Sequence, residues 1–125
     1  MGAKSRLTIA ILLITLLTLA GCSANGYRNI NAEEAKKLID AGGVKIVDVR
    51  TPHEFNEGHI QGAQLIELNQ VAAKSASWPK DEKILFVCAS GSRSAAAAQM
   101  MVEKGYTQVY NLAGGVYQWR YGLVQ

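Results

Sequence analysis

Residues 84–94, which read ILFVCASGSRS, decide the fold and single out one side chain. The apolar run at the start is typical of a buried strand, and the alanine-rich segment that follows predicts a helix from Ser94 to Lys104. Cys88 therefore lies where a strand ends and a helix begins. The free N–H groups at a helix N-terminus favour a negative group placed among them, and the thiolate is the nucleophilic form of cysteine. This position predicts a reactive cysteine with a depressed pKa.

The loop after the strand is suited to hold an anion. Gly91 allows the backbone to curl so that successive N–H groups point inward. Arg93 carries a planar, permanent charge that suits an oxyanion; it could instead brace the loop, but the sequence offers no obvious partner for a brace. Ser94 is the predicted helix N-cap, with Ser92 as the alternative. The candidate substrate-binding residues around the thiol are Ala89, Ser90, Gly91, Ser92, Arg93 and Ser94.

Helices and short apolar strands alternate along the chain after about residue 30. Besides residues 84–87, the predicted strands are 44–49, 65–68 and 106–112. Helical segments are predicted after an Asn31 N-cap with a capping box to Glu34, at 69–74, at 94–104 and at 116–121, whereas 50–62 is predicted to be a loop. The alternation is typical of an α/β domain whose mainly parallel sheet is covered on both faces.

Polar residues follow another predicted strand, and functional sites in such sheets lie beyond the carboxyl ends of the strands. Asp48 and Arg50 lie at the end of strand 44–49, so we expect them to share a crevice with Cys88. Asp48 is expected to accept backbone hydrogen bonds, and Arg50 is expected to pair with Glu54 and hold the neighbouring loop.

The two histidines of the chain, His53 and His59, are weak evidence for a metal site because no cysteine cluster accompanies them. We expect His59 to anchor the loop through hydrogen bonds. The sequence predicts neither a metal nor a cofactor.

The first 21 residues have the features of an export signal. Lys4 and Arg6 precede an uncharged run from Leu7 to Ala20, which is shorter than the ~20 residues that a membrane-spanning helix needs. The small residues before Cys22 resemble the lipobox of bacterial lipoproteins, in which this cysteine is acylated. An ordinary signal peptide and an uncleaved anchor are the alternatives.

The lipoprotein interpretation divides the chain into a signal peptide (1–21), a tether from lipidated Cys22 (22–29) and a folded domain (30–125). It predicts a lipoprotein of the bacterial cell envelope that faces the periplasm. Ser23 follows Cys22 where an aspartate would be needed for retention in the inner membrane, by resemblance to the sorting pattern of enteric-type lipoproteins. This favours the outer membrane.

Charge and cysteine content fit a mature exported domain. The 125-residue chain has 13 basic and 10 acidic side chains, and loss of Lys4 and Arg6 lowers the basic count to 11 and the net charge to +1. No basic stripe with interleaved aromatic residues suggests nucleic-acid binding. With Cys22 lipidated, Cys88 would have no disulfide partner, so it is either reactive or simply buried. Its place at a strand end favours a reactive thiol.

Three motifs together resemble the rhodanese family. Residues 88–94 resemble the active-site loop of its single-domain sulfurtransferases. The other two are an N-terminal signature (Asp48-Val49-Arg50, Glu54-Phe55, Gly58-His59-Ile60, Gly62-Ala63) and a C-terminal signature (Leu112-Ala113-Gly114-Gly115, Trp119).

The resemblance covers residues 29–124 and implies a five-stranded parallel sheet between helices. It also implies that Cys88 takes sulfane sulfur from a donor such as thiosulfate, becomes a persulfide and passes the sulfur to cyanide or another thiophilic acceptor, without a general base.

Two other functions remain open on the sequence. A persulfide carrier without turnover, or an accessory module that serves a protein sulfur acceptor, would have the same loop. A thiol-based oxyanion hydrolase or reductase would also use a cysteine-to-arginine cradle. However, the corresponding loop of cysteine phosphatases resembles Cys-x5-Arg, whereas this chain has Cys-x4-Arg. The tighter ring suits a single sulfur atom better than a tetrahedral phosphate.

Overall fold

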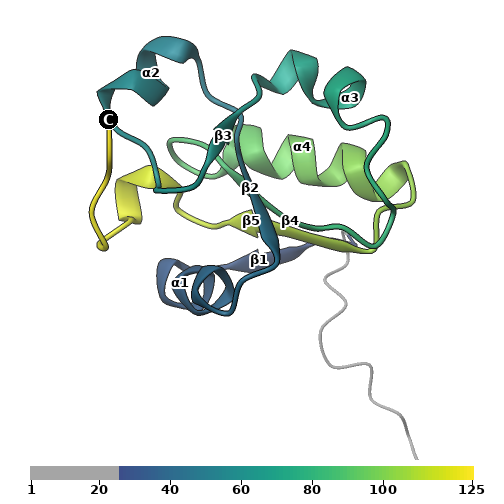
Figure 1. Ribbon diagram of the computed structural model, residues 1–125, viewed down its shortest axis with the longest axis horizontal. Coiled ribbons are helices and arrows are strands. Elements are labelled where there is room, and N and C mark those ends of the chain that lie inside the picture. The colour runs from purple at the N-terminus through teal and green to yellow at the C-terminus, as the bar shows by residue number, and fades with distance from the viewer. Residues whose placement is uncertain (1–25) are drawn as a thin grey trace, which may run out of the picture.

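Five parallel strands form the centre of the computed structural model, which describes residues 26–125. The strand order across the sheet is β1-β5-β4-β2-β3, and every neighbouring pair is parallel (Figure 1). The strands are β1 (Arg28–Ile30), β2 (Val44–Asp48), β3 (Gln64–Leu65), β4 (Lys83–Val87) and β5 (Gln108–Leu112). This confirms the α/β fold with a five-stranded parallel sheet.

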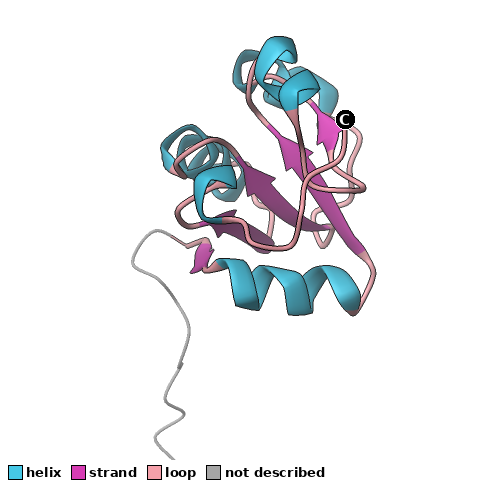
Figure 2. Cartoon of the chain, turned by 90° about the vertical axis from the view of Figure 1, so that its left-hand side faces the viewer, coloured by secondary structure: helices cyan, strands magenta, loops and turns pink. Residues whose placement is uncertain are grey.

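Helices cover both faces of the sheet. In both views α1 (Ala32–Asp40) lies on one side, and α3 (Val71–Lys74) and α4 (Ser92–Glu103) lie on the other (Figures 1 and 2). The remaining short elements are α2 (Pro52–Glu57) and the 3-10 turns η1 (Leu68–Gln70) and η2 (Val116–Gln118). Two apolar clusters result, one on each face of the sheet.

The central strand β4 determines where the thiol points. All of Ile84, Leu85, Phe86 and Val87 are fully buried, as expected for a strand covered on both faces. Successive side chains alternate between the faces, so Ile84 and Phe86 pack in the α4 cluster and Leu85 and Val87 pack in the α1 cluster. Continuing the alternation, Cys88 falls on the α4 side.

The capping box of α1 is confirmed. The Asn31 side chain accepts a hydrogen bond from the Glu34 N–H at 2.9 Å, and the Glu34 carboxylate accepts from the Asn31 N–H at 3.3 Å. A second capping box starts α2 inside the segment that was predicted to be a loop. There Thr51 is the N-cap, Pro52 opens the helix and Glu54 returns the bond. The loop prediction was wrong because the Thr-Pro-x-Glu sequence supplies an N-cap, a first-turn proline and a capping-box glutamate, which together start a helix.

The structure also differs from the prediction near both ends of the domain. Strand β1 pairs with β5, and Tyr27 before it is buried, so Arg28 and Asn29 belong to the domain and not to the predicted tether. The predicted C-terminal helix is only the 3-10 turn η2. The predicted signal peptide and Cys22 lie outside the described residues. From Gly26 to Gln125, no helix is long and apolar enough to cross a membrane.

A buried ion pair secures the carboxyl end of β2. Asp48 is fully buried and Arg50 is 6% exposed, and their closest nitrogen–oxygen distance is 2.8 Å. Arg50 Nη2 also donates to the Gly58 carbonyl at 2.8 Å, and the Arg50 backbone N–H donates to Asp48 Oδ1. Asp48 therefore accepts a backbone bond as predicted, but the predicted Arg50–Glu54 pair is wrong. The arginine instead connects β2 to the chain after α2.

We expect Arg50→Met to lower the free energy of unfolding by about 3–5 kcal/mol, because it leaves the Asp48 carboxylate buried without its partner. Urea unfolding followed by circular dichroism measures the loss. The matched control is Lys36→Met, which breaks the exposed Lys36–Asp40 pair and should change stability by less than about 1 kcal/mol. Equal stability of the two variants would contradict the structural role given to Arg50.

Candidate active site

The Cys88 thiol lies inside the loop that joins β4 to α4. Its Sγ accepts a hydrogen bond from the Gly91 N–H at 3.1 Å and another from the Ser94 hydroxyl at 3.3 Å. The side chain is a free thiol and is 0% exposed. The sequence left a choice between a reactive and a simply buried cysteine, but the structure combines burial with a set of donors aimed at the sulfur.

Hydrogen bonds lower the pKa of the thiol in spite of its burial. Burial by itself raises the pKa of Cys88, because it removes water from the charged form. The Ser94 hydroxyl and the backbone N–H groups of Ser94, Gly91 and Ser90 outweigh that effect, and the pKa lies below the ordinary value of a cysteine. This agrees with the predicted depression and gives it a cause: short-range donors around the sulfur.

Helix α4 starts two residues before the predicted cap. Gly91 is the N-cap, with a left-handed φ of 102°, and the helix begins at Ser92. Neither Ser94 nor Ser92 is the cap. Ser94 occupies the third helical position instead and is buried, and its hydroxyl points back at the sulfur. Ser90 and Ser92 are exposed, and their hydroxyls lie 3.4 Å from each other.

Arg93 has a partner that the sequence did not reveal. Its two terminal nitrogens donate to the two carboxylate oxygens of Glu54, each at 2.8 Å. Hydrogen bonding to Arg93 is the main reason that the pKa of Glu54 falls to about 2, so the pair stays charged at any physiological pH. Arg93 was predicted to bind substrate because no bracing partner could be identified. That reason no longer holds, since Arg93 and Glu54 brace α4 against α2.

The turn between β5 and η2 holds the outer side of the loop. The Val116 N–H donates to the Cys88 carbonyl at 2.9 Å, and the Tyr117 N–H donates to the Ala89 carbonyl at 3.1 Å. Gly115 makes this approach possible, because a Cβ at that position would lie 2.4 Å from the Ala89 oxygen. Because the turn binds these two carbonyls, the N–H groups of the next residues in the loop can face the sulfur.

The histidines have structural partners. His59 Nδ1 lies 2.9 Å from the Phe55 carbonyl, and the two rings stack with centroids 3.7 Å apart, in agreement with the predicted loop anchor. His53 lies against Glu57 at the surface. Within residues 26–125, no group of three His, Cys, Asp or Glu side chains is placed to hold a metal ion.

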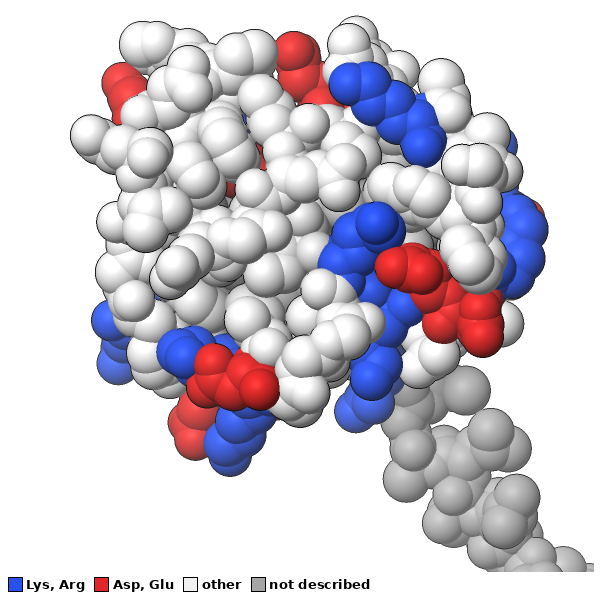
Figure 3. Space-filling view, viewed as in Figure 1, with Lys and Arg blue, Asp and Glu red and all other residues white. Residues whose placement is uncertain are grey.

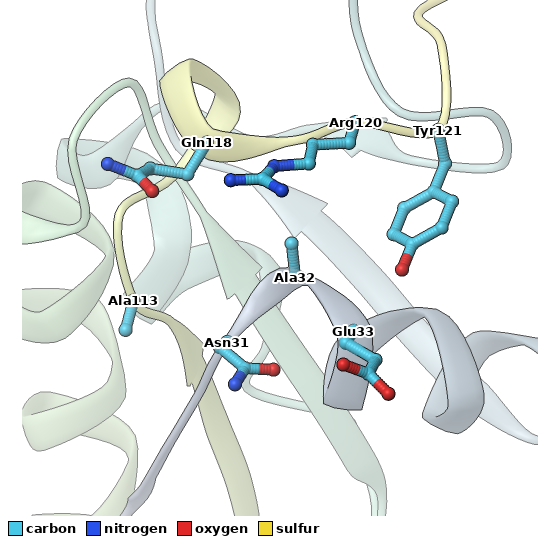
Figure 4. A pocket seen from close by; sticks show the side chains of 7 residues that line it. All are labelled: Asn31, Ala32, Glu33, Ala113, Gln118, Arg120 and Tyr121. Atoms are coloured by element: carbon cyan, nitrogen blue, oxygen red, sulfur yellow. The ribbon is translucent and has the colours of Figure 1, made fainter.

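A pocket of about 260 Å³ opens at the same edge of the sheet, beside the loop. Gln118, Arg120 and Tyr121 form one wall, and Asn31, Ala32 and Glu33 face them across the opening (Figure 4). Ala113 closes the side nearest the loop, where its Cα would lie 3.7 Å from a Cβ at Gly91. On the face in Figure 3, basic and acidic side chains are interspersed.

The sequence matches the rhodanese-like domain family over residues 31–121. The chain belongs to the rhodanese-like family. The match covers strands β2 to β5, the loop around Cys88 and the turn that holds the loop.

Similar proteins come from several bacteria. A sulfurtransferase of Allochromatium vinosum is 36% identical over 90 residues, which is 71% of this chain and 84% of the relative. The thiosulfate sulfurtransferase GlpE of Stutzerimonas stutzeri is 35% identical, over 76% of this chain and 86% of its own length. The crystal structure of a rhodanese-like domain protein from Staphylococcus aureus is 35% identical, with a TM-score of 0.69, and covers 78% of this chain and 96% of that one. The relatives support a rhodanese-type sulfurtransferase activity.

We expect Ser94→Ala to raise the pKa of Cys88, because the thiolate loses its hydroxyl donor. The rate of alkylation by iodoacetamide as a function of pH reports the thiolate, and its midpoint should move upward by roughly half to one pH unit. Ser92→Ala is the matched control, since within residues 26–125 the Ser92 hydroxyl has only the Ser90 hydroxyl as a hydrogen-bond partner, and its midpoint should not move. An unchanged midpoint in Ser94→Ala would show that the hydroxyl does not stabilise the thiolate.

Proposed function

We propose that this protein transfers sulfane sulfur from thiosulfate or a similar donor to cyanide or a thiol acceptor, through a persulfide on Cys88. The observation that carries the proposal is the thiol itself: a buried Sγ, with a lowered pKa, that accepts hydrogen bonds from Gly91 and Ser94. The 35% identity to a thiosulfate sulfurtransferase supports thiosulfate as the donor.

The first half-reaction loads the cysteine. The Cys88 thiolate attacks the outer sulfur of thiosulfate, an S–S bond forms to Cys88, and the S–S bond of thiosulfate breaks to release sulfite with the bonding electron pair. The persulfide then carries the single negative charge that the thiolate carried before. No proton moves, so the step needs no general base near the sulfur.

The second half-reaction empties the cysteine. Cyanide attacks the terminal sulfur, a carbon–sulfur bond forms, and the persulfide S–S bond breaks to regenerate the thiolate and release thiocyanate. The charge at the cysteine is again one negative unit. A cradle of N–H and O–H dipoles that stabilises an anionic sulfur therefore serves every stage of the cycle.

Access to the thiol requires a movement, because Cys88 is 0% exposed. A donor must displace loop atoms, or the cysteine side chain must turn outward, before sulfur can be transferred. Ser90 and Ser92 are exposed, and their hydroxyls are the candidate contacts for the donor's oxygens. Arg93 serves in this proposal as a brace for the loop through Glu54.

Incubation of the purified domain with thiosulfate and cyanide should produce thiocyanate, and Cys88→Ser should abolish the product. Lys36→Met, which breaks an exposed ion pair on α1 and leaves the active-site loop unchanged, should retain most of the activity. Intact-mass spectrometry after thiosulfate alone should show an adduct of one sulfur atom that disappears with Cys88→Ser.

Each other outcome has a defined meaning. The sulfur adduct without thiocyanate formation indicates a persulfide carrier that delivers sulfur to a protein acceptor. Full activity of Cys88→Ser rejects Cys88 as the sulfur acceptor. Steady turnover of a phosphate ester or of arsenate, with no sulfur adduct, replaces the proposal with an oxyanion hydrolase or reductase.

We further propose that the protein is exported and anchored to the bacterial cell envelope, with its domain facing the periplasm. The support is the order of basic residues, uncharged run and Gly21-Cys22 at the start of the sequence. The outer membrane is the proposed location because Ser23 follows Cys22. The domain begins at β1, so Cys22 is separated from Arg28 by only five residues. A lipid on Cys22 would keep the catalytic domain close to the membrane surface.

In its bacterial host, the protein should partition with the membrane fraction, and mass spectrometry should find acylation on Cys22. Cys22→Ser should release it from the membranes, whereas Cys88→Ser, the matched control, should remain bound. Membrane association of Cys22→Ser together with an unmodified Cys22 in the parent would reject the lipid anchor.

A further inference from the structure

Asn111 is a buried polar residue that lies on β5, directly beside Phe86 of β4. It is 3% exposed, on a strand whose other buried residues are apolar. A buried amide of this kind normally satisfies all its donors and acceptors. The contacts that it does and does not make indicate its role.

The Asn111 amide nitrogen bridges two acceptors from different parts of the chain. Nδ2 donates to the side-chain oxygen of Asn29 on β1 at 2.9 Å and to the carbonyl of Gly91 in the active-site loop at 3.2 Å. Both partners are oxygens, so the amide cannot be turned over without facing oxygen to oxygen. The orientation of Asn111 is therefore fixed by its surroundings.

The other end of the same amide is not satisfied. Asn111 Oδ1 is buried and has no hydrogen-bond partner among the described residues. An unpaired buried acceptor destabilises a fold, and an apolar side chain of the same shape avoids that penalty. Stability alone would favour leucine at this position. The hydrogen bonds made by the amide nitrogen explain better why asparagine stands at this position.

The Asn111 amide holds Gly91, the residue whose N–H points at the sulfur. The Gly91 N–H donates to Cys88 Sγ at 3.1 Å, while the Gly91 carbonyl accepts from Asn111 and from the Ala95 N–H at 3.2 Å. Gly91 has a left-handed φ of 102° and no side chain to restrict it. Fixing its carbonyl limits the rotation of the residue and thereby the direction of its N–H.

We propose that Asn111 is a positioning residue for the sulfur cradle: it fastens the Gly91 carbonyl so that the Gly91 N–H stays aimed at Cys88 Sγ. This extends the proposed function, because it assumes that an anionic sulfur at Cys88 is the working form. Its test does not depend on sulfur transfer, since the thiolate can be measured directly by alkylation.

Asn111→Leu keeps the size of the side chain and removes both donors. The midpoint of its pH–alkylation profile should rise by roughly half to one pH unit, and alkylation at neutral pH should slow by roughly three- to ten-fold. Asn29→Ala is the matched control, because it breaks the other bond of the Asn111 amide and spares the bond to Gly91. Its midpoint should stay at the parent value.

Two results would overturn the proposal. One is an unchanged midpoint in folded Asn111→Leu. The other is an equal rise in Asn29→Ala, which would mean that the amide merely joins β1 to β5. If Asn111→Leu fails to fold, Asn111→Ala and amide hydrogen exchange at Gly91 replace it: exchange should accelerate in Asn111→Ala and not in Asn29→Ala, and equal rates in the two variants reject the proposal.

Thiocyanate formation by the same proteins separates this inference from the proposed function. A parent protein that never turns over thiosulfate, but whose thiol midpoint rises in Asn111→Leu, supports the positioning role and removes the proposed activity. If the parent is active but Asn111→Leu leaves the thiol midpoint unchanged, the proposed activity is supported and the positioning role is rejected.

Discussion

The hydrogen bond from the Gly91 N–H to Cys88 Sγ is the interaction on which the rest of the site depends. It exists because β4 ends at Val87 and the chain must turn at once into α4, with Gly91 as the helix cap. The strand places the cysteine on the α4 face, and the left-handed glycine directs its N–H inward. Other contacts then keep this arrangement in place: the turn at Gly115 holds the Cys88 and Ala89 carbonyls, and Asn111 holds the carbonyl of Gly91.

The sequence was sufficient for the parts of this arrangement that depend on local pattern. The apolar run before Cys88, the glycine after it and the alanine-rich helix predict a thiol among helix N-terminal amides, and the structure places it there. The β2 and β4 ends could be brought together from the general rule for parallel sheets, and β2 does pair with β4. The Asn31 capping box could be predicted from the local pattern, because its two partners are only three residues apart.

Contacts between distant segments could not be predicted in this way. Glu54 is near Arg50 in the sequence, yet Arg50 pairs with Asp48 inside the fold and Glu54 turns toward Arg93, 39 residues away. Nothing in the local pattern shows that Glu54 will pair with Arg93, because that contact depends on where the fold places α2 relative to α4. Asn111 was missed for the same reason: its partners are 20 and 82 residues away. The short β1 was missed because three residues carry too little periodicity to indicate a strand.

The pairing of the charged residues agrees with a sulfur that is stabilised mainly by hydrogen-bond donors and less by a full positive charge. Arg93 is matched by Glu54, and Arg50 by Asp48, so each cation beside the loop is neutralised by its own carboxylate. The charge on the sulfur is then stabilised mainly by N–H groups and the Ser94 hydroxyl. Thiolate and persulfide carry the same single charge, so a dipolar cradle stabilises both in the same way. In the proposed reaction, an unpaired arginine at that place would also bind the released sulfite and would slow its release. The ion pairs therefore contribute rigidity to the loop, and in the proposed reaction they leave the released anion without an unpaired cation to hold it.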